Sequence, residues 1–186
     1  MNFTRHLELT GLHATLSPSS YHWINYSDEK LEEWFGTRME AARGTALHEF
    51  ARQAIVLKIK LPRTTATLNQ YVNDALGYKM IPEQILYYSD NCFGTTDAIM
   101  FRHNLLRVHD LKNGVSKSSF HQLEVYASLF CLEYDFKPSQ IKIELRIYQN
   151  DDVEIYEPDI DDITHIMDRI VTFDRRIDQM KAEVQS

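Results

Sequence analysis

The chain has 186 residues, of which 44% are hydrophobic and 25% charged; this composition excludes a largely disordered protein and fits one folded domain. A formal charge of −7 argues against a uniformly basic nucleic-acid-binding domain, but basic residues confined to one groove remain compatible with it. The two cysteines, Cys92 and Cys131, lack C-x-x-C spacing, which excludes a cysteine-rich zinc or iron–sulfur site.

Membrane and secretory signals are not found in the sequence. No basic leader precedes an apolar stretch, and no apolar run approaches the roughly 20 residues that span a bilayer. We therefore expect a cytoplasmic protein with no membrane association.

Helical patterns fill the first 80 residues. Ser27 and Asp28, followed by two glutamates, indicate a helix start, and Gly36 indicates its end. Apolar residues at helical spacing over residues 38–59 predict a second helix that begins at Gly44 and Thr45. A third pattern, over residues 65–80, predicts a helix that stops at Gly77.

From residue 81 the pattern changes to short runs rich in aliphatic and aromatic residues. The runs at residues 83–89, 94–103 and 105–112 are separated by turn signals and predict a three-stranded antiparallel meander. An amphipathic helix follows over residues 118–134, with Ser118 or Ser119 as its N-cap.

The last quarter of the chain predicts two strands and a helix. Apolar and polar residues alternate over residues 139–149, which indicates a strand with one buried face. Residues 152–158 are its expected hairpin partner, and residues 159–180 form the expected closing helix.

This order of elements predicts an α/β (α+β) fold, a mixed sheet flanked by helices with core order α-β-β-β-α-β. A strand–helix–strand crossover after the meander makes at least one parallel pair. We expect one domain over residues 1–186, with a helical part at 1–80 and the sheet core and flanking helices at 81–186.

Two aspartates and a lysine occupy related places in the meander. Asp97 opens one predicted strand and Asp110 ends the next. Lys112 shares a face with Asp110, because side chains two apart in a strand point the same way. Adjacent antiparallel strands would bring Asp97 close to Asp110, so we expect a pair of carboxylates with an ammonium group beside it.

Such a cluster suits Mg²⁺ or Mn²⁺, which prefer oxygen ligands in near-octahedral array. The backbone carbonyl of Leu111 could add a third oxygen, and His48 a nitrogen that would favour Mn²⁺. Lys112 would orient or help deprotonate the attacking water and stabilise charge at a phosphate. For Asp110 and Lys112 alone the alternative is a strand-end ion pair; for His48 alone it is a core or capping histidine.

Four motifs together resemble a known superfamily. They are "RGTALHEF" at residues 43–50, "FGTTDAIMF" at 93–101, "HDLKNG" at 109–114 and "HQLEVYASLF" at 121–130. In order and approximate spacing they resemble the PD-(D/E)XK nuclease superfamily, and within it the RecB-type branch, which includes CRISPR-adaptation and phage-encoded exonucleases. The resemblance covers residues 17–149 and implies a restriction-endonuclease-like fold.

The resemblance implies a role for each matching residue. His48, Asp97 and Asp110 would bind the metal, and Lys112 would serve catalysis. Gln122 and Tyr126 would contact DNA near the site; lying four apart, they share one helix face. Tyr126 also lies on the apolar stripe of its helix, so a core position is its alternative.

Other residues have weaker assignments. Glu49 and Glu83 are candidate outer-shell acids, with a solvated or structural role as the alternative. Candidate groove residues, each of which has a scattered, solvated position as its alternative, are Lys58, Lys60, Arg63, Arg102, Arg107, Lys112 and Lys117.

We therefore expect a Mg²⁺- or Mn²⁺-dependent DNA nuclease, an exonuclease of DNA recombination, DNA repair or phage DNA processing in a bacterial or phage-infected cell. The cysteines needed for the iron–sulfur cluster of many relatives are missing. No G-x-x-x-x-G-K-[ST] motif occurs, so ATP-driven unwinding would need a helicase partner. A recombination or annealing protein and a homo-oligomer are further candidate partners.

Two alternatives stay open. One is a structure-specific or nicking endonuclease that uses the same site. The other is a non-catalytic DNA-binding or protein-interaction module that keeps the fold. The sequence does not choose between single- and double-stranded DNA.

Overall fold

The computed structural model describes residues 18–114 and 116–185. The chain divides into two units, Met1–Ala42 and Arg43–Ser186. Residues 1–17 of the expected helical part lie outside the described residues. The first unit contains a 3-10 helix, η2 (Pro18–Asn25), and the start of helix α1 (Asp28–Val56). The second unit contains the rest of α1 and all other elements.

Helix α1 is continuous where two helices were expected, so the predicted end at Gly36 and the predicted start at Gly44 and Thr45 are wrong. Gly36 lies among helix-forming residues, and a glycine there costs only about 1 kcal/mol relative to alanine. Gly44 serves close packing instead, because a Cβ atom there would lie 2.8 Å from Nδ2 of Asn113.

Helix α2 (Thr67–Tyr78) confirms the third predicted helix and runs one residue past the expected stop at Gly77. Lys79 ends it with a left-handed backbone, at a φ of 55°. The N–H groups of Lys79 and Met80 donate to the carbonyls of Leu76 and Ala75, so the last turn closes without a glycine.

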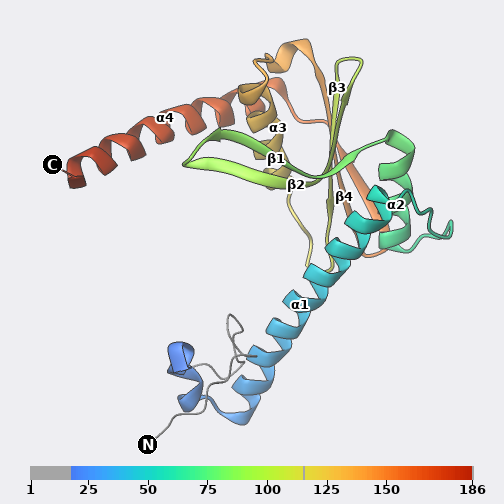
Figure 1. Cartoon of the computed structure of the whole chain (residues 1–186), viewed down its shortest axis with the longest axis vertical. Helices are drawn as coiled ribbons and strands as arrows, with labels where there is room; N and C mark the ends of the chain where they lie inside the picture. Colours follow the sequence, from blue (N-terminus) through green and yellow to red (C-terminus); the bar gives the residue numbers. More distant parts are fainter. Residues whose placement is uncertain (1–17, 115, 186) are drawn as a thin grey trace, which may run out of the picture. The chain divides into compact units, whose positions relative to one another are not determined.

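The strands form one five-stranded mixed sheet in the order β1-β2-β3-β4-β5 (Figure 1). Strands β3 and β4 are parallel and the other neighbours antiparallel, which confirms the mixed α+β fold, the meander and the hairpin. The crossover contains α3 and a short 3-10 helix, η3. The bounds are β1 Ile81–Ser89, β2 Cys92–Arg102, β3 Leu105–Leu111, α3 His121–Glu133, η3 Pro138–Gln140, β4 Lys142–Gln149 and β5 Asp152–Tyr156.

Each face of the sheet has its own apolar core. On one face Leu106 and Val108 of β3 pack with α3 and the start of α4 (Ile160–Gln185). On the other face Leu111 packs with the last turns of α1 and with α2. Because side chains alternate along a strand, Asp110 lies on the α3 side of β3 and His109 on the α2 side.

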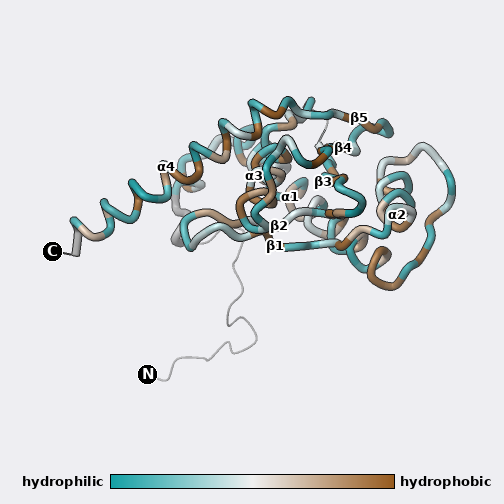
Figure 2. Tube along the Cα trace, turned by 90° about the horizontal axis from the view of Figure 1, so that it is seen from above, coloured by the Kyte–Doolittle hydropathy of each residue, from teal (hydrophilic) through white to brown (hydrophobic). Residues whose placement is uncertain are grey.

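The two helices that follow the meander differ from the expectation at their ends. Helix α3 begins at His121 after Phe120 with no side-chain cap, so the predicted serine cap is wrong. The N–H group of Ser118 instead donates to Oε1 of Gln149 on β4. Helix α4 extends past its expected end at residue 180, and apolar residues recur along its length (Figure 2). Among the described residues, no helix has both the length and the apolar character needed to cross a membrane.

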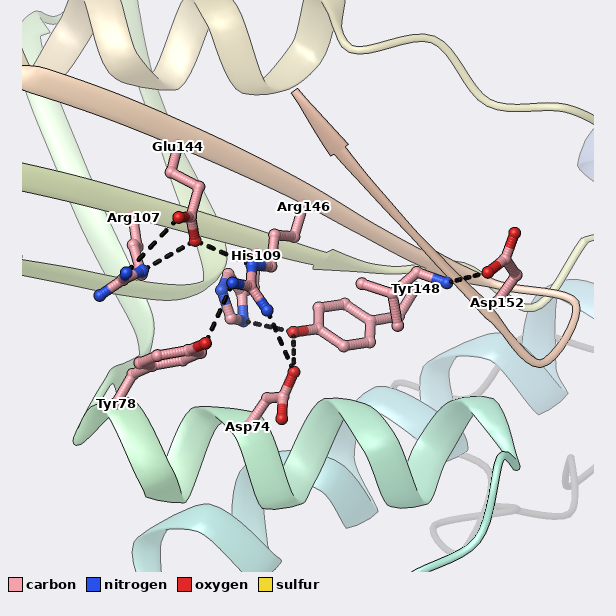
Figure 3. A network of polar contacts seen from close by, with 9 residues as sticks. Asp74, Tyr78, Arg107, His109, Glu144, Arg146, Tyr148 and Asp152 are labelled. Carbon is pink, nitrogen blue, oxygen red and sulfur yellow. Dashed lines mark hydrogen bonds and ion pairs between the residues drawn. The ribbon is translucent and has the colours of Figure 1, made fainter. Parts of the chain in front are cut away.

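A network of polar side chains links β3 and β4 to α2 (Figure 3). Glu144 accepts from Arg107 at 2.7 Å and from Arg146 at 2.8 Å. The hydroxyl of Tyr148 donates to Asp74 at 2.8 Å, so its oxygen is left to accept from Nδ1 of His109 at 3.2 Å. The network fixes the register of the parallel pair and holds α2 against it.

His109 is fully buried in this network, and its Nε2 has no hydrogen-bond partner. Burial disfavours the imidazolium form, and with the nearby charges of Arg146 and Arg107 it lowers the pKa of His109 to about 3. The native chain therefore contains His109 as the neutral imidazole.

We predict that His109 makes the fold sensitive to acid. Its stabilising contribution is fully present above its ordinary pKa of 6.5 and is lost as the pH falls toward about 3, because the unfolded chain takes up a proton that the native chain excludes. His109→Phe should flatten the dependence of the unfolding free energy on pH, between pH 6 and 4, by about 1.4 kcal/mol per pH unit. Urea unfolding at a series of pH values measures this. His165→Gln, at an exposed position on α4, is the control and should leave the slope unchanged.

Candidate metal centre

The backbone of Leu111, at the end of β3, joins three segments of the chain. Its N–H group donates to Oδ2 of Asp97 at 2.8 Å, and its carbonyl lies 2.6 Å from Nε2 of His48. A carbonyl oxygen can only accept, so Nε2 of His48 carries the proton. The other ring nitrogen, Nδ1, lies 3.5 Å from Oδ1 of Asp97. Residues from α1, β2 and β3 thus meet at one point.

Asp97 and Asp110 lie across from each other on adjacent strands. The last paired residues of β2 and β3 at this end are Ala98 and His109, and the two aspartates are the next residue on each strand. The sequence analysis had placed Asp97 at the start of its strand. Asp97 instead lies within β2, because this strand begins at Cys92. Like charges directly opposite in an antiparallel pair are destabilising, so this arrangement has a cost to the fold.

Lys112 connects this pair to helix α3. Its Nζ lies 3.0 Å from Oδ2 of Asp110 and donates to Oε1 of Gln122 at 3.0 Å. Gln122 in turn donates to the hydroxyl of Tyr126 at 3.5 Å, and that hydroxyl donates to the carbonyl of Thr95 at 2.6 Å. The polar residues of the last motif therefore face the strand ends, although Tyr126 also packs against the apolar core.

Close packing holds these motifs together through residues that were not singled out from the sequence. A Cβ atom at Gly94 would lie 2.9 Å from the ring of Tyr126, so β2 admits this ring only because residue 94 is glycine. Gln149 donates to the carbonyls of Gly114 and Ser116, at 2.5 and 2.9 Å, and so holds the loop after Lys112. Gly94 lies in a quoted motif, but the partner of each contact depends on the tertiary fold.

The two candidate outer-shell acids are placed differently. Glu49 is exposed and bonds to Arg52 and Gln53 on its own helix, which lowers the pKa of its carboxyl to about 2. Glu83 lies on β1 opposite Asp97 of β2, between the pairs Pro82–Ala98 and Gln84–Thr96. Its backbone is left-handed, with a φ of 53°. Of the two acids, only Glu83 borders the recess at the centre.

That recess is too narrow to admit a water molecule. Its lining also includes Tyr71, which lies in the helix predicted over residues 65–80 and was not singled out from the sequence. Burial and the charges of Asp97 and Asp110 raise the pKa of the Tyr71 phenol, so it lies beside the carboxylates as a neutral group. The residues that line the recess are His48, Ala51, Arg52, Tyr71, Glu83, Asp97 and Leu111.

Burial is the main influence on both carboxylates. It raises the pKa of Asp97 and of Asp110, against the lowering effects of the Leu111 N–H group on Asp97 and of Lys112 on Asp110. Asp110 is 4% exposed, and its Oδ2 has no partner in hydrogen-bond geometry, although Lys112 is close. A buried, unsatisfied carboxylate oxygen beside a second carboxylate is a position that a cation would stabilise.

The donor set fits Mg²⁺ or Mn²⁺ in kind: two carboxylates, a backbone carbonyl and an imidazole. Within residues 18–114 and 116–185, no three His, Cys, Asp or Glu side chains are already arranged as a metal-binding group. The reason lies in the contacts above, because the proton of His48 is directed at the Leu111 carbonyl and one oxygen of Asp97 accepts from the Leu111 N–H group. His48, Leu111 and Asp97 thus bond to one another, and Asp110 takes no part in these bonds.

We predict that Asp110→Asn stabilises the protein when divalent ions are chelated. Because the pKa of Asp110 is raised in the fold, its contribution to stability is present at low pH, where it is protonated, and is lost as the pH rises through that raised pKa. A neutral amide avoids this loss and the repulsion from Asp97. A gain of about 1 kcal/mol would raise the melting temperature by about 2–4 °C at pH 7.5.

The matched control is Asp168→Asn, an exposed position on α4, which should not change the melting temperature. Mn²⁺ should raise the melting temperature of the unaltered chain more than that of Asp110→Asn. A lower melting temperature for Asp110→Asn in chelator would identify the contact with Lys112 as a structural ion pair.

Comparison with known proteins places the chain in one family. Residues 79–176, more than half of the chain, match the family described as "Protein of unknown function (DUF2800)". The match contains Asp97, Asp110, Lys112 and the α3 motif, and it begins after His48. Neither the curated proteins nor the solved structures contain a match to the chain. The chain belongs to the DUF2800 family.

Proposed function

We propose that the chain is a metal-dependent deoxyribonuclease of the PD-(D/E)XK superfamily and RecB-like branch, with a restriction-endonuclease-like core. The observation that carries the proposal is the facing pair Asp97 and Asp110 with Lys112 3.0 Å from Asp110. A strand-end ion pair needs only one of these carboxylates. A buried and a half-buried carboxylate, both with raised pKa values and beside an ammonium group, suit a site built for a divalent cation and a phosphate.

Asp97, Asp110, the Leu111 carbonyl and His48 would hold Mg²⁺ or Mn²⁺. When bound, the ion would polarise the scissile phosphate and lower the pKa of a water molecule. His48 would bind the ion as the neutral imidazole, through its unprotonated Nδ1, which lies 3.5 Å from Oδ1 of Asp97, while its Nε2 proton stays on the Leu111 carbonyl.

Lys112 and α3 would act on the phosphate. The ammonium of Lys112, held between Asp110 and Gln122, would orient the attacking water and neutralise charge that develops on the phosphate oxygens. The amide of Gln122 and the hydroxyl of Tyr126, fixed by the Thr95 carbonyl, would contact the adjoining backbone of the DNA.

We predict that the purified chain degrades end-labelled linear DNA with Mn²⁺ or Mg²⁺. Asp110→Asn and Lys112→Met should each lower the rate by about 100-fold or more, because they remove a metal ligand and the catalytic cation. Lys142→Met is the matched control for the lysine. It is exposed and pairs with the start of β3, at the opposite end of the strand from Lys112, so its rate should be unchanged.

Full activity in both variants would reject this site. The proposal has one specific rival, a non-catalytic module that keeps the fold, which the direct bond between His48 and the Leu111 carbonyl favours. Titration calorimetry separates the two. Heat on addition of Mn²⁺ that disappears in Asp110→Asn supports the nuclease, whereas DNA binding without Mn²⁺ binding supports the module.

We also predict an exonuclease mode. Linear duplex should be degraded, and covalently closed circular DNA of the same sequence should stay intact, because an exonuclease requires a strand end. Gel electrophoresis after equal times measures both. Nicking or linearisation of the closed circle would instead assign the same residues to an endonuclease.

A further inference from the structure

A second pocket, of about 560 Å³, lies where helices α1 and α2 end. Its apolar floor is formed by Ile55 of α1, by Ala75 and Leu76 of α2, and by Met80. This volume is typical of sites that hold small molecules or parts of larger ligands. The remaining lining residues are three lysines, Lys58, Lys60 and Lys79.

The two helix ends present their lysines in the same way. In α1 the N–H groups of Lys58 and Ile59 donate to the carbonyls of Ile55 and Ala54, and α2 ends with the same pattern at Lys79. Lys58 and Lys79 both have a left-handed backbone, with φ values of 56° and 55°. Glycine is the usual residue at such positions, because other residues pay about 1–2 kcal/mol there. Lysine therefore occupies both positions at a cost to the fold.

The charge of this pocket is unusual for a chain with a net charge of −7. No acidic residue lines it, and within the described part of the chain none of the three lysines takes part in an ion pair. All three are exposed. The partial negative charge of the helix ends would favour Lys58 and Lys79. It does not explain Lys60 or the exclusion of carboxylates, whereas an anionic ligand explains both.

The pocket and the candidate metal centre share one face of α1. Ile55 follows His48 by seven residues, which is close to two helical turns and about 10 Å along the axis at 1.5 Å per residue. At 3.4 Å per nucleotide, a duplex strand would cover that distance in about three nucleotides. A strand whose phosphate lies at the metal centre would thus have its neighbouring nucleotides within reach of the lysines.

We propose that this pocket binds a single-stranded segment of the DNA substrate, with a base against the apolar floor and flanking phosphates on Lys58, Lys60 and Lys79. The proposal rests on the nuclease function and assigns the strand-binding site that accompanies it. An anionic lipid would also meet an apolar floor and a lysine rim, but the shared face of α1 with His48 favours the nucleic acid.

The test measures binding without cleavage, by fluorescence anisotropy of a labelled 15-nucleotide oligothymidylate in EDTA. Changing Lys58, Lys60 and Lys79 together to Gln should weaken binding at least tenfold at low salt. It should also reduce the slope of log affinity against log salt by about 2, since each phosphate contact on a single strand contributes about 0.7. The control changes Lys137, Lys142 and Lys181 to Gln, which removes the same charge at exposed positions elsewhere.

Unchanged affinity and slope in the pocket variant, or an equal loss in both variants, would overturn the proposal. So would binding of the chain to phosphatidylglycerol vesicles, lost in the pocket variant, together with no binding of the oligonucleotide. A chain that binds through the pocket lysines but never cleaves with Mn²⁺ would reject the nuclease and keep the pocket. A pocket variant that cleaves DNA at the normal rate would reject the pocket and keep the nuclease.

Discussion

The two hydrogen bonds of Leu111 are the constraint on which the candidate site depends. A residue at the end of a strand has an N–H and a carbonyl group that the sheet does not fully use, and here Asp97 takes the first and His48 the second. The carboxylate of Asp97 thereby continues the β2–β3 contact where the backbone ladder has ended. The backbone of one residue, Leu111, thus fixes a side chain from β2 and one from α1 directly after Asp110.

The parallel crossover supplies the other side of the site. Because β4 pairs with β3 in parallel, the chain must cross the sheet, and α3 makes that crossing over the face that carries Asp110. Lys112 then meets Gln122 with no residue between them. The glycine at position 94 lets the ring of Tyr126 lie directly on β2, which fixes the rotation of α3 about its axis.

The parts of this arrangement that could be predicted from the sequence are those set by local patterns. Alternation gave the buried face of β4, and the turn signals gave the meander that brings Asp97 opposite Asp110. The unbroken helix α1 could not be predicted, because by local preference Gly36 indicates the end of a helix and Gly44 the start of another, whereas the folded chain continues one helix through both. The left-handed positions of Lys58 and Lys79 at the ends of α1 and α2 were not predicted for a related reason. Such a position is normally recognised in a sequence by a glycine, and here it is a lysine.

Contacts between motifs required the fold. The spacing of Lys112 and Gln122 suggests nothing about a bond between them, since it depends on where the crossover lands. The position of Glu83 beside Asp97 depends on the β1–β2 register, and the resemblance to a nuclease superfamily indicated roles without these distances. The family to which the chain belongs does not decide among those roles.

Three consecutive residues of β3 show how the fold carries a destabilised site. His109 points into the polar network on the α2 side, Asp110 points to the α3 side, and Leu111 offers its backbone between them. Arg107, Glu144 and Arg146 pair with one another, whereas Asp110 is buried opposite Asp97, has a raised pKa and has only the ammonium group of Lys112 close to its Oδ2. Because side chains alternate, the polar network can hold the strand from one face while the other face carries the two facing carboxylates.

Helix α2 extends this coupling to the lysine pocket. Asp74, one turn before the end of α2, accepts from Tyr148 and Arg146, so the network that holds β3 also holds this helix end. The left-handed backbone of Lys79 and the carboxylates at the end of β3 are therefore both supported by the same buried contacts. A change that loosened the network would disturb both places together, and variants that separate binding from cleavage must consequently leave Asp74, Arg146 and Tyr148 unaltered.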